Sequence, residues 1–208
     1  MPAIIPGATD KAIAHWLETR IRAALARTSG TVALAVPGGS TPFPILALLA
    51  ARKLDWERLA FYPTDDRIVP LDHPASNTGK LKALFEPLGA EVRELALGDT
   101  PPFALVWLGM GADGHIASLF PNTNPQSHDP QRVRRLTPDP LPPEAPFDRI
   151  TLTIPALIDS GELLLVIRGG DKLAVLEAAL AGENDLPVSR LLRAAAQQSA
   201  ALPVTCFT

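Results

Sequence analysis

Apolar positions along the chain predict alternating helices and buried strands. In residues 9–28 the apolar side chains recur at helical spacing, with Thr9 or Asp10 available as the cap, so we expect an amphipathic helix there. Short apolar runs typical of strands are TVALAV (31–36), RLAFYP (58–63), PFALVWLGM (102–110), RITLTI (149–154), ELLLVIRG (162–169) and PVTCF (203–207). Further helices are expected within residues 37–53, 76–88, 171–180 and 188–196.

Strands that alternate with helices imply right-handed crossovers and a mainly parallel sheet with helices on both faces. We therefore expect an α/β fold, and the length suits a single domain over residues 1–208. The stretch from Pro121 to Pro146 is rich in proline and has no clear period, which predicts an ordered surface excursion. Ligands bind beyond the carboxyl ends of parallel strands, so the turns after the buried strands should converge on one crevice.

Composition limits the classes of partner and compartment. The formal net charge is −3, so no basic surface is expected for a nucleic acid or an anionic membrane. The single cysteine, Cys206, excludes an internal disulfide and indicates a reducing compartment. The sequence has neither a signal-peptide pattern at its N-terminus nor an apolar run of membrane-spanning length. We expect a cytoplasmic protein, either a monomer or a homodimer.

The first candidate site is the turn after residues 31–36, where Gly38, Gly39, Ser40 and Thr41 precede a predicted helix. Glycines let a ligand approach the backbone, and the free amides of a helix N-terminus favour an anion. The turn lacks the GK[ST] of a Walker sequence and the glycine spacing of a dinucleotide site. It predicts a phosphate-binding loop, and a plain strand-to-helix turn is the alternative.

The second candidate is the turn after residues 58–63, which contains Asp65, Asp66 and Arg67. An arginine there can hold a phosphate or polarise a carbonyl oxygen, and a carboxylate can accept hydrogen bonds from sugar hydroxyls. A solvated acidic loop with an internal ion pair is the alternative.

The third turn, GMGADGHIASLFPN, is the most specific feature. Its glycines, Gly109, Gly111 and Gly114, allow unusual backbone angles that can present Asp113 and His115 to the crevice. Imidazole titrates near neutrality and can take a proton from water that attacks an ester carbonyl, while Asp113 orients the ring. The alternative is a histidine that caps the next helix.

The fourth turn contains Lys172, which follows two glycines and can reach toward a phosphate, unless it is an exposed first-turn lysine. Arg168 and Arg190 are weaker candidates of the same kind. The remaining histidines, His15, His73 and His128, are interpreted as surface, turn or packing residues.

Taken in order, the pieces PGGSTP, DDRIVPLDHPASN, GMGADGHIASLFP, GGDK and PVSRLL resemble the 6-phosphogluconolactonase family from about Val32 to Leu192. The resemblance implies a modified Rossmann-like fold shared with sugar-phosphate isomerases and deaminases, with no metal and no organic cofactor. It implies hydrolysis of 6-phospho-D-glucono-1,5-lactone, in the oxidative pentose phosphate pathway, with His115 as general base. Asp113 and Arg67 would assist catalysis, and Asn77 would join the substrate-binding residues.

Two alternatives belong to other functional classes. Glucosamine-6-phosphate deaminases, which are relatives of the lactonases, carry a carboxylate where this chain has Phe120 and an Asp-Glu-Tyr loop where it has Asp65, Asp66 and Arg67. Both departures favour the lactonase, although Asp66 stands where that family usually has Glu. A non-catalytic sugar-phosphate sensor is disfavoured by the presence of His115, and no DNA-binding module is visible.

Overall fold

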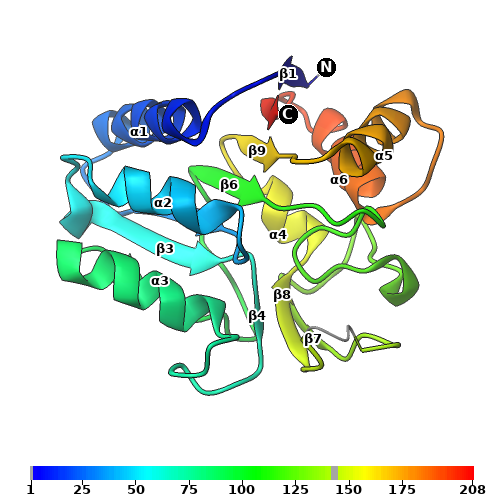
Figure 1. Cartoon of the computed structure of the whole chain (residues 1–208), viewed down its shortest axis with the longest axis horizontal. Helices are drawn as coiled ribbons and strands as arrows, with labels where there is room; N and C mark the ends of the chain where they lie inside the picture. Colours follow the sequence, from blue (N-terminus) through cyan, green and yellow to red (C-terminus); the bar gives the residue numbers. More distant parts are fainter. Residues whose placement is uncertain (1, 142–144) are drawn as a thin grey trace.

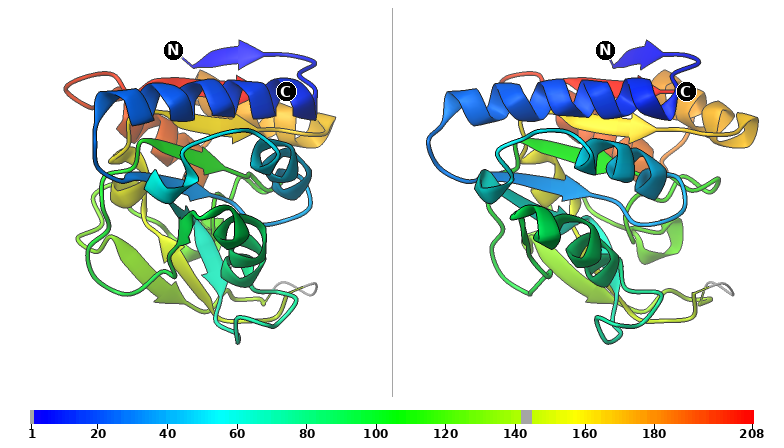
Figure 2. Two further views of the ribbon diagram at one scale, coloured as in Figure 1. Left: turned by 90° about the vertical axis from the view of Figure 1, so that its left-hand side faces the viewer. Right: turned by 60° about the vertical axis from the view of Figure 1, so that its left-hand side comes forward.

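The computed structural model describes residues 2–141 and 145–208, which form a seven-stranded parallel sheet and a smaller three-stranded antiparallel sheet (Figure 1). The strand order of the large sheet is β1 (Ala3–Ile5), β10 (Val204–Phe207), β9 (Leu163–Val166), β6 (Leu105–Leu108), β2 (Val32–Val36), β3 (Leu59–Pro63) and β5 (Glu91–Val92). The order of the small sheet is β4 (Asp65–Arg67), β8 (Arg149–Leu152) and β7 (Val133–Leu136). Pairing of β1 with β10 brings the two ends of the chain to one edge (Figure 2).

Helices cover both faces of the large sheet. On one face lie α1 (Asp10–Arg27), α2 (Pro42–Ala50) and α3 (Asn77–Phe85), and on the other lie α4 (Ile154–Ile158), α5 (Gly170–Ala181), α6 (Pro187–Ala196) and the small sheet. Three short 3₁₀ helices complete the described elements: Trp56–Arg58, Glu86–Leu88 and Pro121–Thr123.

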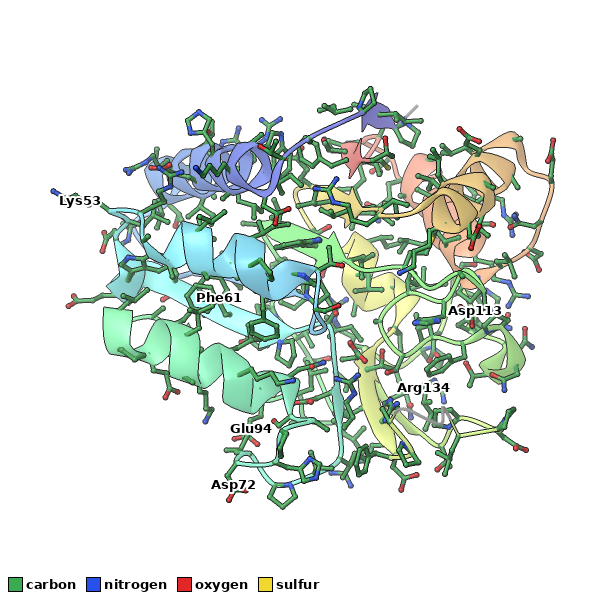
Figure 3. All side chains as sticks on the ribbon, in the orientation of Figure 1. Lys53, Phe61, Asp72, Glu94, Asp113 and Arg134 are labelled. Carbon is green, nitrogen blue, oxygen red and sulfur yellow. The ribbon has the colours of Figure 1, made fainter. Side chains whose placement is uncertain are left out.

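The central strands are continuously apolar because both of their faces are buried. In β6 the side chains of Leu105 and Trp107 join the core beside α1–α3, whereas Val106 and Leu108 join the opposite core. Successive strand residues point to opposite faces, so a strand covered on both sides has no polar position available. Packing is close on the α3 side, where the rings of Phe61 and Phe85 stack with centroids 4.0 Å apart (Figure 3 labels Phe61).

The predicted α/β fold and its long elements are confirmed, with three local corrections. Residues 149–154 begin as a strand, but that strand, β8, belongs to the small antiparallel sheet rather than the parallel one. Residues 65–67 form β4 instead of a turn. The excursion from Pro121 to Pro146 contains a 3₁₀ turn and β7, and its residues 142–144 lie outside the described residues. Elements of two to four residues are too short to show a period.

Candidate active site

A cavity of about 270 Å³ opens at the carboxyl ends of the central strands, where β2 neighbours β6. From β2 the chain proceeds to β3 and β5 on one side and returns to β6, β9 and β10 on the other, so the cavity lies at the topological switch point. Its lining contains most of the predicted site residues: Gly38, Gly39, Ser40, Thr41, Asp65, Arg67, Asn77, His115 and Lys172.

His115 and Asp113 form a close pair at one side of this cavity. The imidazole Nδ1 lies 2.6 Å from Oδ1 of Asp113, and the same oxygen accepts the His115 backbone N–H at 3.2 Å. The His115 side chain is 32% exposed, and its ring packs against Phe120 with centroids 4.9 Å apart. Because Nδ1 is occupied by the carboxylate, Nε2 is the ring nitrogen left for a ligand or a water molecule. Figure 3 labels Asp113 on the loop that follows β6.

The glycines of this loop permit the pair to form. A Cβ on Gly111 would lie 2.5 Å from Oδ1 of Asp113 and closer still to the His115 ring, so only glycine leaves room for both side chains. The Gly111 N–H donates to the His115 carbonyl at 2.9 Å and closes the turn. Gly114 has a φ of +78° and lies against Leu186, which precedes α6.

The loop after β2 presents polar groups at the N-terminus of α2. Gly39 has a φ of +99°, which favours glycine, and the Thr41 side chain makes no capping hydrogen bond to the helix. The Thr41 hydroxyl is therefore not used by the helix, and of the first three residues of α2 only Phe43 has a backbone N–H, because Pro42 and Pro44 have none. A Cβ on Gly38 would overlap the amide group of Asn77, so this glycine allows close contact between the loop and α3.

Asn77, the first residue of α3, holds the Arg67 side chain and the Asp65 backbone of β4. Its Oδ1 accepts the Arg67 Nη1–H at 2.8 Å, and its Nδ2 donates to the Asp65 carbonyl at 2.8 Å. The Asp65 carboxylate lines the cavity and accepts the Ser118 hydroxyl at 2.5 Å. Burial raises the pKa of Asp65, an effect that the Ser118 hydrogen bond and the Arg67 charge partly oppose.

Asp66 points the other way, and the structure places it outside the cavity lining. Its side chain is buried, and its two oxygens accept hydrogen bonds from the backbone N–H groups of Arg67, Asn77 and Thr78 at 2.6–2.8 Å and from the Thr78 hydroxyl at 2.6 Å. A carboxylate at this position satisfies the free amides of α3 and its dipole. This arrangement does not support the predicted contact between Asp66 and substrate.

Arg168 also lines the cavity, and its Nη2 donates to the Ala8 carbonyl at 2.7 Å. Arg190 is not among the lining residues, because its guanidinium binds Asp185 and the turn at Asn124. His73 packs against Phe147, and neither it nor the other two histidines set aside from the sequence lines the cavity.

Sequence reasoning missed two residues: Ser118, which holds Asp65, and Trp107, which lines the cavity from the end of β6. The GMGADGHIASLFP motif contains Ser118 and could have indicated it, whereas Trp107 is one apolar residue in an apolar strand and gave no signal.

The cavity lining combines three cationic side chains with the His115 imidazole, which pairs with Asp113. Arg67, Arg168 and Lys172 supply positive charge, which suits an anionic ligand. Within residues 2–141 and 145–208, no group of three or more His, Cys, Asp or Glu side chains could hold a metal ion. No helix of this part of the chain is both long and apolar enough to cross a membrane.

Comparisons with known proteins agree with this geometry. The model of the family described as glucosamine-6-phosphate isomerases/6-phosphogluconolactonase matches residues 6–89 and 82–200. The chain is 39% identical to a 6-phosphogluconolactonase of Pseudomonas aeruginosa, over 84% of this chain and 83% of the relative. A 6-phosphogluconolactonase of Rhizobium meliloti is 37% identical, with 92% of each chain covered.

Solved structures extend the likeness to the whole fold. The crystal structure of a 6-phosphogluconolactonase from Shewanella baltica has a TM-score of 0.81 and 26% identity, and covers 100% of this chain and 98% of its own. That of Thermotoga maritima has a TM-score of 0.82 at 24% identity, with 100% and 99% covered.

Proposed function

The chain belongs to the glucosamine-6-phosphate isomerase/6-phosphogluconolactonase family, and on this premise we propose that it hydrolyses 6-phospho-D-glucono-1,5-lactone to 6-phospho-D-gluconate with His115 as general base. The observation that carries the proposal is the His115–Asp113 pair, which faces a cavity lined by Arg67 and Lys172. The curated relatives described above bear the lactonase name, which favours hydrolysis over deamination.

Phe120 supports the same choice. Its ring lies 4.9 Å from the imidazole, at the sequence position where the deaminases carry a carboxylate, and a phenyl group cannot transfer a proton. A single base, His115, is sufficient for water attack on an ester carbonyl.

The proposed reaction begins with neutral His115, whose Nδ1–H donates to Asp113 so that Nε2 carries the free lone pair. Nε2 takes a proton from water as the oxygen attacks the lactone carbonyl, and Asp113 stabilises the imidazolium that forms. The tetrahedral intermediate then expels the ring oxygen, which takes the proton from the His115 imidazolium and becomes the new hydroxyl of 6-phosphogluconate, so that His115 returns to its neutral form. No covalent enzyme intermediate is required.

The substrate's phosphate is proposed to bind the loop from Gly38 to Thr41 together with Lys172. The backbone N–H groups and hydroxyls of this loop and the lysine charge are all suited to a phosphate. Arg67 adds charge that serves either the phosphate or the developing oxyanion. Positioning of this kind lowers the barrier by fixing the carbonyl next to the base.

The test generates fresh lactone from glucose 6-phosphate and follows its hydrolysis above the spontaneous rate. We expect the wild-type protein to accelerate hydrolysis and His115→Ala to lose about 10²–10⁴-fold in kcat, the usual range for a general base. His15→Ala is the matched control, because the His15 side chain is 75% exposed on α1.

Each other outcome rejects a defined part of the proposal. Equal activity of His115→Ala and wild type would reject His115 as the base, and no acceleration by the wild-type protein would reject the lactonase. Glucosamine 6-phosphate is expected to release no ammonia, and its release would indicate a deaminase instead.

A further inference from the structure

Trp107 carries a buried polar group, its indole N–H, that the proposed mechanism does not use. Its relative exposure is 0%, and its Nε1–H has no hydrogen-bond acceptor among the described residues. Burying a donor without an acceptor costs stability, because the group loses its hydrogen bonds to water. Buried indole groups usually have a partner, and in this chain Nε1 of Trp56 donates to the Arg52 carbonyl at 3.3 Å.

The position of Trp107 relates this unpaired donor to the cavity. The residue lines the cavity from β6, which lies between β2 and β9 in the sheet. The loop from Gly38 to Thr41 follows β2, and Arg168 and Lys172 follow β9. The Trp107 side chain belongs to the core beside α1–α3, the face on which α2 begins. It therefore lies between the two segments that are suited to an anion.

Arg168 supports an anion at this corner. Its Nη2 donates to the Ala8 carbonyl and lies 3.4 Å from Oδ1 of Asp10, so the segment before α1 and the first residue of that helix hold the guanidinium at the cavity. The backbone N–H groups of the loop from Gly38 to Thr41, the Arg168 guanidinium and the Trp107 indole thus supply donors from three neighbouring strand ends. All three are donors without acceptor atoms of their own, a combination that suits a phosphate better than a sugar hydroxyl.

We propose that the Nε1–H of Trp107 donates a hydrogen bond to the phosphate group of the bound substrate, so that Trp107 helps to select phosphorylated lactones. The identity of the substrate rests on the proposed function, whereas the phosphate contact can be tested without any turnover.

The first test observes the donor directly by ¹H–¹⁵N NMR of the indole groups. The chain has 3 tryptophans, so the Trp107 resonance is assigned by its loss in Trp107→Phe. Titration with 6-phosphogluconate or inorganic phosphate is expected to move the Trp107 indole proton downfield in a saturable manner. Trp16 and Trp56 should not move, and gluconate, which lacks the phosphate, should leave all three unchanged.

Two NMR results would overturn the inference: a Trp107 resonance that stays in place while other resonances show saturation with 6-phosphogluconate, or one that gluconate moves equally. A phosphate-dependent shift in a protein without lactonase activity would retain the Trp107 contact and reject the proposed function. The two proposals can therefore fail separately.

The second test is kinetic. Trp107→Phe keeps an aromatic ring and removes the N–H, and we expect KM for the lactone to rise about tenfold, with a smaller change in kcat. Trp56→Phe is the control, since it removes a buried indole remote from the cavity lining and should leave KM unchanged. An unchanged KM in a folded Trp107→Phe protein would contradict the contact. If that variant does not fold, the NMR titration of the wild-type protein decides.

Discussion

Replacement of Gly111 by alanine tests whether the His115–Asp113 pair is the reacting group. The added Cβ would lie 2.5 Å from Oδ1 of Asp113, whereas an ordinary contact is about 3.5 Å, so that oxygen must withdraw by about 1 Å and the imidazole by more. Displacement of a base by about 1 Å costs on the order of 10²-fold in rate. We therefore expect Gly111→Ala to lower kcat about 100-fold.

The assay compares kcat and KM on fresh lactone with thermal unfolding of the same preparations. Gly109→Ala is the matched control in the same turn, because a Cβ there meets nothing nearer than Pro37 at 3.9 Å. Gly111→Ala should remain folded, with its loss mainly in kcat. Wild-type kcat in Gly111→Ala would refute the reasoning, and an equal loss in Gly109→Ala would show that the turn as a whole, rather than the pair, is sensitive.

Three further predictions concern carboxylates near the cavity and the single thiol. Asp66→Ala should lower the free energy of unfolding by about 3 kcal/mol in urea titrations, because it leaves buried backbone amides of α3 unpaired. The same substitution should leave KM within twofold of the wild-type value. A raised KM with unchanged stability would instead indicate that Asp66 contacts the substrate. Burial raises the pKa of folded Asp65, so its contribution to stability is present at low pH and is lost as the pH rises through that pKa. Asp65→Asn should therefore gain stability relative to wild type with rising pH, and a pH-independent difference would argue against the raised pKa. Burial raises the pKa of the Cys206 thiol to about 11, so the native protein should not react with a thiol reagent at about pH 8. The protein unfolded in urea should react once per chain. Rapid reaction of Cys206 in the native protein would contradict its burial.

Long, strongly patterned elements could be predicted from the sequence, and the small sheet could not. The helix at residues 10–27 has apolar side chains at helical spacing, which predicts one buried face. The strand at residues 105–108 is apolar throughout, which predicts burial on both faces. β4 and β7 have three and four residues, and polar side chains fill most of their positions. Their pairing with β8 depends on tertiary contacts that no local pattern contains.

Site residues divide in the same way. Glycine-rich turns at strand ends indicated His115, Asp113 and the loop at Gly38, because such turns serve close approach of a backbone to a ligand. The sequence predicted a turn at Asp65–Arg67, and side chains in a turn do not point in alternate directions as they do in a strand. The direction of each of these side chains therefore could not be predicted from the sequence. Trp107 was missed because its indole N–H is unusual only once its surroundings are known.

The pleat of β4 limits how this protein can be shortened or lengthened. Asp65 and Arg67 line the cavity, whereas the Asp66 carboxylate accepts a hydrogen bond from the first backbone N–H of α3. Alternate residues of this three-residue strand therefore face the cavity and the helix. Deletion of one residue just before Asp65 would shift the triplet in register and turn Arg67 toward the positive end of α3. For engineering, the number of residues in β4 is as strict a requirement as their identity.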